Sequence, residues 1–242
     1  MAILSFSKEN NSLGLTMRQA QPGPEAELVD LFVSQFYEKK EKVQKKYAVF
    51  FEPLLPTGFP DIVIAEYNEQ AFSNWNDARR KLEIIDLKLL HHLYYAGGAS
   101  SDQIFQQLGF SQGDLLYSLE RLLDANLIRR NSQKWVPISL RKAYGIKSLH
   151  AIEAKIGKWD SVLNQAFLNK WFASESSVLM PVVTPSKQNQ VRAAKQGVGI
   201  YTVAGNHKKI LQFAPAEKGN IPTCYASWFF NEWIGRKLVS GR

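Results

Sequence analysis

The chain has 242 residues, 45% of them hydrophobic and 12% aromatic, a composition that supports a folded core and excludes an intrinsically disordered chain. Its 30 Lys and Arg residues outnumber its 22 Asp and Glu residues, and the formal charge of +8 favours polyanionic partners such as nucleic acid. The single cysteine, Cys224, excludes an intramolecular disulfide framework and a multi-thiolate zinc site.

Membrane and secretion signals are the next features to consider. No apolar run approaches the roughly 18 residues that a membrane span requires. The first residues, MAILSFSKENN, lack the basic region and the long apolar region of a secretion signal. We therefore expect a cytoplasmic protein without a membrane partner.

The first predicted elements are a helix and a β-hairpin. A proline- and glycine-containing breaker at 21–24 precedes residues 25–39, whose apolar spacing and acidic first turn predict an amphipathic helix. Residues 47–55 and 59–67 are rich in aromatic and β-branched side chains, and a Pro-Thr-Gly turn at 56–58 joins them. Together they predict two antiparallel strands.

A helical pattern follows in the middle of the chain. It extends from Asp77 to the glycines at 97–98, and a second helix is predicted over 101–108. Gly109 marks a tight turn before a third helix over 112–125, after which two short strands flank a polar turn. This order of elements resembles a winged helix-turn-helix module, which we expect to span residues 77–140.

Basic residues of this module and just beyond it are candidates for contacts with DNA phosphates, because a wing brings such groups against the backbone. They are Arg129, Arg130, Lys134, Arg141 and Lys142. The third helix, however, carries Asp114, Glu120 and Asp124 against Arg121. Its acidity leaves open the alternative that the module makes protein contacts or mediates dimerisation.

The last hundred residues alternate between strand and helix patterns. Strands are predicted at 148–156, 177–183, 199–203 and 209–213, and helices at 160–173 and 187–196. The alternation predicts an α/β core in which helices flank a mixed sheet. A terminal helix carries Trp228, Phe229, Phe230 and Trp233, an aromatic cluster expected to dock onto the core or onto a second subunit.

Three charged residues stand out within apolar strand patterns. Glu153 and Lys155 alternate along AIEAKI, so a regular strand would point both side chains to the same face. An edge-strand salt bridge would explain this pair alone. Asp61, however, opens the hydrophobic strand DIVIAEY, and two carboxylates from neighbouring strands can jointly hold Mg²⁺ or Mn²⁺.

The set Pro60-Asp61 followed by Glu153-Ala154-Lys155 resembles the motif of the PD-(D/E)xK nuclease superfamily, which has the restriction-endonuclease-like fold. The order of elements is also similar: a helix bearing a glutamate, a hairpin carrying the aspartate, the E-x-K strand, then helix and strand. The resemblance implies a discontinuous core of residues 1–70 and 146–242. The winged helix inserted between Asp61 and Glu153 is a departure from many members.

The resemblance also implies roles for individual residues. Asp61 and Glu153 would be metal ligands and Lys155 the catalytic cation. Glu25 corresponds to the helix glutamate and is preferred over Glu27 because it lies one turn before Leu28 on the same face. Gln165 matches a glutamine that some branches carry on the helix after the E-x-K strand.

The expected function is that of a Mg²⁺- or Mn²⁺-dependent endodeoxyribonuclease, with the winged helix positioning DNA. The alternative is a non-catalytic DNA-binding regulator or assembly subunit that retains the nuclease fold. In either case DNA is the expected partner, and a homodimer or other protein subunits are further candidates.

Overall fold

The computed structural model describes residues 3–8, 15–41, 43–204 and 209–240. The chain folds into two compact units. The first, here called the core unit, comprises Met1–Tyr67 and Ile146–Thr223, and the second, the helical unit, comprises Asn68–Gly145 and Cys224–Arg242. Each unit is therefore made of two separate segments of the chain.

A seven-stranded mixed sheet forms the centre of the core unit, with the order β1-β2-β3-β6-β7-β8-β9. Parallel pairs are β1–β2, β6–β7 and β7–β8, and the other pairs are antiparallel. The strands are β1 (Leu4–Phe6), β2 (Lys46–Phe51), β3 (Ile62–Tyr67), β6 (Ile146–Ala154), β7 (Glu175–Met180), β8 (Gly199–Ala204) and β9 (Lys209–Ala214).

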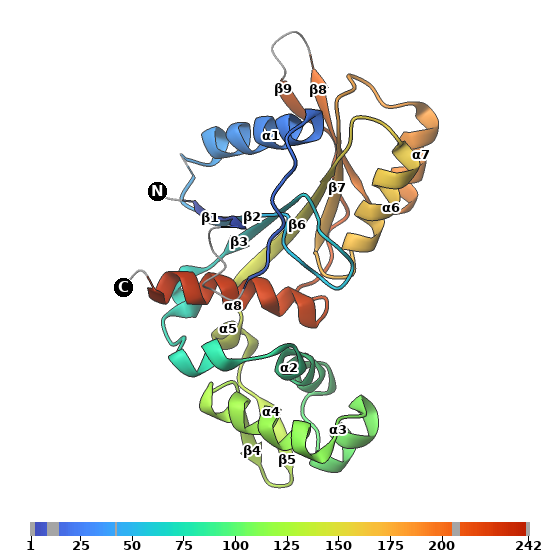
Figure 1. The fold of residues 1–242 in the computed structure, drawn as a ribbon. Coiled ribbons are helices and arrows are strands. Elements are labelled where there is room, and N and C mark those ends of the chain that lie inside the picture. The colour runs from blue at the N-terminus through green and yellow to red at the C-terminus, as the bar shows by residue number, and fades with distance from the viewer. Residues whose placement is uncertain (1–2, 9–14, 42, 205–208, 241–242) are drawn as a thin grey trace. The chain divides into compact units, whose positions relative to one another are not determined.

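Helices cover both faces of this sheet (Figure 1). Helix α1 (Pro24–Lys40) buries Leu28, Phe32 and Val33 against one face. On the opposite face, α6 (Trp159–Asn169) and α7 (Lys187–Lys195) pack against strand residues that include Val178 and Ile200. The predicted α/β class, a mixed sheet flanked by helices, is confirmed.

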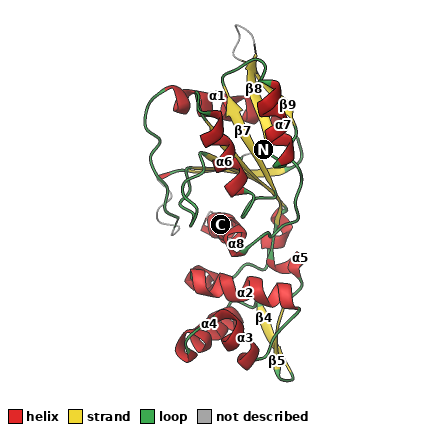
Figure 2. Cartoon of the chain, turned by 90° about the vertical axis from the view of Figure 1, so that its right-hand side faces the viewer, coloured by secondary structure: helices red, strands yellow, loops and turns green. Residues whose placement is uncertain are grey.

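The helical unit contains three consecutive helices and a hairpin (Figure 2). Two short 3-10 helices, Glu69–Phe72 and Asp77–Lys81, precede them. The other elements are α2 (Ile84–Ala96), α3 (Ser101–Leu108), α4 (Gln112–Asp124), β4 (Ile128–Asn131), β5 (Lys134–Pro137), α5 (Leu140–Ala143) and α8 (Tyr225–Ser240).

Local sequence explains where the helices of this unit begin and end. Ser100 and Gln103 form a capping box at the start of α3, and the Ser111 side chain caps α4. Between them Gly109 adopts φ 63°, a left-handed conformation that glycine tolerates without steric cost. A buried Asp86 on α2 binds Ser118 and Arg121 of α4 and thereby fixes the two helices together.

Three differences from the sequence-based prediction concern how the chain is divided into elements and units. Residues 77–81 form a 3-10 helix rather than the start of α2, since the Asn76 side chain caps a separate short turn. The three-residue strand β1 was not predicted. The segment from Cys224 groups with the helical unit, whereas the predicted core extended to residue 242.

Side-chain contacts explain why α8 belongs to the helical unit. Trp228 stacks on Tyr94 of α2 at 5.3 Å between ring centroids and meets the Tyr144 ring edge-on at 4.9 Å. Glu232 forms a buried ion pair with Arg79, with Oε2 2.9 Å from Nε. The aromatic cluster thus docks within the helical unit. Among the described residues, no helix is both long and apolar enough to cross a membrane.

Candidate active site

Asp61 and Glu153 meet where β3 begins and β6 ends. The antiparallel register pairs Ile62 with Ile152, which brings the residue before β3 beside the last residues of β6. The Oδ2 atom of Asp61 accepts a hydrogen bond of 2.7 Å from the backbone N–H of Ala154. This bond fixes the Asp61 carboxyl group at the end of β6.

Glu153 is almost completely buried, with 3% of its surface exposed. Its Oε1 atom accepts a 2.6 Å hydrogen bond from the Asn169 amide at the end of α6. The charge of Asp61 also acts on this carboxyl group. Because Asp61 accepts a hydrogen bond from the residue that follows Glu153, the two residues lie side by side at the end of β6, as two ligands of one cation must.

The proximity of these acids in a buried place changes their ionisation. Burial raises the pKa of Glu153 to about 8, and the neighbouring charge of Asp61 adds to the effect. Burial also raises the pKa of Asp61, although the Ala154 N–H bond and the Lys155 charge oppose this. A bound divalent cation would favour the ionised form of both groups and so offset these pKa shifts.

Asp61 and Glu153 would be the two protein ligands of a divalent cation at this place. In the part of the chain that the structure describes, no group of three or more His, Cys, Asp or Glu side chains is arranged to hold a metal ion. Mg²⁺ is commonly held by one or two carboxylates, with water and substrate phosphate completing its shell. Asp61 and Glu153 meet that smaller requirement.

Lys155 contacts a different helix from Glu153. Its Nζ atom lies 2.9 Å from Oε2 of Glu25 in the first turn of α1, whereas Glu153 contacts Asn169 of α6. Burial acts to lower the pKa of Lys155, but the bond to Glu25 and the charges of Asp61 and Glu153 raise it on balance. The ammonium group is therefore charged, and it interacts electrostatically with both carboxyl groups.

The expectation that the side chains of Glu153 and Lys155 point to the same face of the sheet is wrong, because Lys155 contacts α1 and Glu153 contacts α6. Strand β6 ends at Ala154, so the alternation of side chains does not continue regularly to Lys155. The predicted contact set is nevertheless brought together: Glu25, Asp61, Glu153 and Lys155 lie in one region of the core unit.

The role that the resemblance implies for Gln165 stays a prediction. This residue is exposed on α6, and the side chain of this helix that contacts Glu153 is Asn169, one turn later. Asn169 lies on the buried stripe of α6 with Val162 and Ala166. A polar residue at that helical spacing was the signal that could have identified it.

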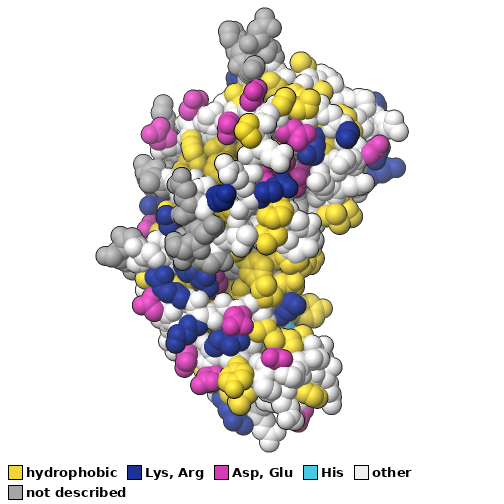
Figure 3. Space-filling model, in the orientation of Figure 1, with side chains coloured by type: hydrophobic (Ala, Val, Ile, Leu, Met, Phe, Trp, Pro, Cys, Tyr) yellow, Lys and Arg dark blue, Asp and Glu magenta, His cyan; other side chains and the backbone are white. Residues whose placement is uncertain are grey.

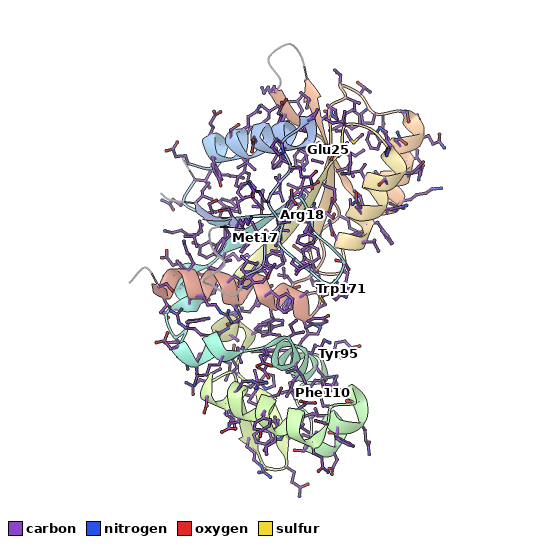
Figure 4. The ribbon with its side chains drawn as sticks, in the orientation of Figure 1. Met17, Arg18, Glu25, Tyr95, Phe110 and Trp171 are labelled. Atoms are coloured by element: carbon purple, nitrogen blue, oxygen red, sulfur yellow. The ribbon has the colours of Figure 1, made fainter. Side chains whose placement is uncertain are left out.

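A cavity of about 510 Å³ opens beside the carboxyl group of Asp61. Its lining includes Arg18, Glu25, Glu52, Asp61 and Lys155. In Figure 4, Glu25 is labelled at the start of α1, and Arg18 is labelled on the segment that precedes this helix. A cavity of this size, with both acidic and basic groups, can accommodate a phosphodiester segment.

The sequence prediction missed Arg18 and Glu52. Glu52 is buried, forms an ion pair with Arg18, and has a φ of 43°, which is rare for a residue other than glycine. Such backbone strain is concentrated at functional sites. Glu52 is a charged residue at the end of the apolar run YAVFF, and this position was a signal that could have identified it. The sequence around Arg18 has no distinguishing pattern.

The basic residues proposed to contact DNA are all exposed on the helical unit. Arg130 lies over the Trp135 ring at 5.5 Å from its centroid. Arg129 on the hairpin and Lys142 on α5 line the same cavity of about 480 Å³. On the face drawn in Figure 3, basic and acidic side chains are interspersed. Contact with DNA on this face would therefore depend on individual basic side chains rather than on one continuous basic surface.

Comparisons with protein-family models, curated proteins and solved structures found no match for this chain. Its function is therefore inferred from the site itself.

Proposed function

We propose that the protein is a metal-dependent nuclease that hydrolyses phosphodiester bonds of DNA. The observation that carries this proposal is the placement of Asp61 at the end of β6, where its carboxyl group accepts a hydrogen bond from the N–H of Ala154, between Glu153 and Lys155 in the sequence. Glu153 is buried and Asp61 is half-buried, and holding two such carboxylates close together has a cost that a bound Mg²⁺ or Mn²⁺ would offset. We also propose membership of the PD-(D/E)xK superfamily, on the order of elements around these three residues.

In this proposal each residue has a distinct task. Asp61 and Glu153 would hold the cation, which supplies Lewis acidity toward a phosphate and its attacking water. Lys155 stabilises negative charge that develops on the phosphate, and Glu25 orients the Lys155 ammonium group through its 2.9 Å bond. Asn169 holds Glu153 in a fixed orientation.

Arg18 is suited to bind the substrate. Its side chain is 55% exposed, it lines the cavity beside Asp61, and its guanidinium group lies 4.9 Å from the centroid of the Phe59 ring. Because guanidinium groups bind phosphate through two parallel hydrogen bonds, Arg18 can move from Glu52 to a neighbouring phosphate of the strand.

The helical unit is proposed to be a winged helix-turn-helix that positions DNA. In support, α2, α3 and α4 are followed by the hairpin β4–β5, with Gly109 at the turn between α3 and α4. Arg129, Arg130 and Lys134 on the hairpin, with Arg141 and Lys142 on α5, would contact phosphates.

A second candidate function is that of a non-catalytic regulator or assembly subunit. The observation that favours it is the exposed surface of α4, which carries Leu116 and Tyr117 together with the acidic residues Glu120 and Asp124. Such a surface suits a protein partner, including a second copy of this chain, better than the negatively charged major groove.

The test of the nuclease proposal is cleavage of supercoiled plasmid and single-stranded DNA with Mg²⁺ or Mn²⁺. Wild type would be compared with Glu153→Ala and Lys155→Ala, and with Glu27→Ala as a matched control on the exposed side of α1. Circular dichroism would establish that each variant is folded. We expect metal-dependent cutting by wild type and Glu27→Ala only.

Two other results would contradict the proposal. Cutting that survives both site substitutions would mean that the assigned residues do not perform the reaction. Failure of wild type to cut either substrate with either metal, while it still shifts DNA in a gel, would favour the regulator.

A further inference from the structure

A second cavity of about 310 Å³ lies in the core unit, between the last turns of α1 and the sheet. None of the proposed catalytic residues lines it. At a rise of about 1.5 Å per residue, Phe36 lies roughly 16 Å along α1 from Glu25. The cavity is therefore separate from the candidate active site, and its size is within the range of small-molecule sites.

Aromatic rings form the walls of this cavity. Phe36 meets the Tyr47 ring edge-on at 5.4 Å, and Phe32 meets the Tyr201 ring edge-on at 5.0 Å. All four side chains line the cavity. Such walls offer aromatic and apolar contacts to a planar heterocycle.

Two carboxylates line the same cavity, Glu66 from β3 and Glu175 from β7. Glu66 already accepts a 2.9 Å bond from Lys45, and the Tyr47 hydroxyl lies 3.5 Å away. Burial raises the pKa of Glu175, and the charge of Glu66 adds to this while Lys218 opposes it. Glu175 would be stabilised by a ligand that donates hydrogen bonds.

The rim of the cavity is basic. Lys39 and Lys40 belong to the last turn of α1, and both line the cavity. The Lys40 ammonium group lies 5.3 Å from the centroid of the Tyr47 ring and 5.9 Å from that of Phe36. These lysines would repel a purely cationic ligand and attract an anionic group at the entrance.

A ligand that fits must therefore combine a planar ring, hydrogen-bond donors on one edge and an anionic group at the other end. We propose that this cavity binds a guanine nucleotide, with its base between the aromatic rings, its adjacent N–H donors on Glu175, and its phosphate on Lys39 and Lys40. Guanine presents two neighbouring N–H groups that match the two oxygens of a carboxylate, whereas adenine does not. The proposal is independent of the nuclease function.

The test is calorimetric titration of the full chain with GMP, AMP, guanosine and the cation agmatine, in the presence of EDTA to remove divalent metal. We expect GMP to bind at least tenfold more tightly than AMP, guanosine or agmatine. Glu175→Gln should reduce the preference for GMP over AMP. The double variant Lys39→Ala, Lys40→Ala should lower the affinity for GMP to that for guanosine. Glu27→Gln, on the exposed side of α1, is the matched control.

Selectivity among the ligands of the wild-type protein tests the proposal even if a variant fails to fold. Absence of GMP binding at millimolar concentration, or equal binding of GMP and AMP, would overturn it. Tighter binding of agmatine would show a site for organic cations instead. Because these titrations require no cleavage, a negative result here leaves the nuclease test unaffected.

Discussion

The amide of Asn169 donates to Oε1 of Glu153, and this bond favours the ionised form of the carboxyl group. Asn169→Ala should therefore raise the pKa of Glu153 further, so that metal binding and DNA cleavage begin at a higher pH. We expect the cleavage rate at pH 7 to fall by roughly tenfold, which corresponds to the free energy of about one hydrogen bond to a charged group. The pH dependence of the cleavage rate measures this effect.

Asn164→Ala is the matched control, because Asn164 is exposed on the same helix. It should leave the pH profile unchanged. A profile for Asn169→Ala that falls in amplitude without moving along the pH axis would contradict the assigned role of Asn169.

Glu153 also links stability to pH. Its pKa in the folded protein is raised to about 8, above the usual 4.5, so the folded state binds the proton more tightly than the unfolded state. Stability in the absence of metal is then greatest at pH values below the usual pKa and falls as the pH rises to about 8. Glu153→Gln should raise the free energy of unfolding at pH 8 by roughly 1–3 kcal/mol.

Urea denaturation in EDTA at pH 5 and pH 8 measures this prediction. The substituted amide carries no charge, so the difference between the two pH values should shrink relative to wild type. A variant that is less stable than wild type at pH 8 would contradict the unfavourable burial of the ionised Glu153 carboxyl group.

At the scale of elements, Asp86 holds α2 against α4. It is fully buried, its carboxyl oxygens accept bonds of 2.5 Å from Ser118 and of 2.7 and 2.9 Å from Arg121, and it also caps α2. Asp86→Ala would leave Arg121 without its buried partner, and we expect a loss of about 3 kcal/mol in the free energy of unfolding. Thermal denaturation measures it.

The matched control is Asp102→Ala, in the exposed first turn of α3. It should cost less than about 1 kcal/mol. Equal effects of the two substitutions would contradict the role of the buried network.

The hairpin β4–β5 is the element expected to contact DNA through Arg129, Arg130 and Lys134. Replacing all three by alanine should weaken DNA binding and reduce the slope of log K against log salt by about 2 to 3, since each phosphate contact contributes about 0.9. Fluorescence anisotropy at several salt concentrations measures both quantities.

The control removes the same charge elsewhere, by alanine substitution of the exposed residues Lys81, Lys147 and Lys209. If the two triple variants show the same salt slope, the hairpin has no special role and binding follows net charge alone.

Periodic patterns predicted most of these elements because each repeats over several residues. The amphipathic stripe of α1 and the apolar strands β3 and β6 are examples, and their bounds lie within a few residues of the prediction. Strand β1 has only three residues, too few for a pattern, and depends on pairing with β2. The change from strand to turn after Ala154, which redirects Lys155, is likewise a tertiary effect.

At the scale of the whole chain, two unpredicted features depend on long-range contacts. Helix α8 joins the helical unit through contacts between residues far apart in the sequence, Trp228 with Tyr94 and Glu232 with Arg79. The pairing of Arg18 with Glu52, 34 positions apart, brings both into the cavity beside Asp61. No local pattern encodes such pairs, whereas Asp61 and Glu153 stood out because each interrupts or opens an apolar strand.

The most direct test of whether Asp61 and Glu153 together bind one divalent cation is a titration with Mn²⁺. Electron paramagnetic resonance measures the free and bound Mn²⁺ at each step. Wild type would be compared with Asp61→Asn, Glu153→Gln and the matched control Glu27→Gln. We expect one Mn²⁺ bound per chain by wild type and control, and binding weakened by at least tenfold in both site variants. Undiminished binding in the site variants, or no binding by wild type, would contradict the shared metal site.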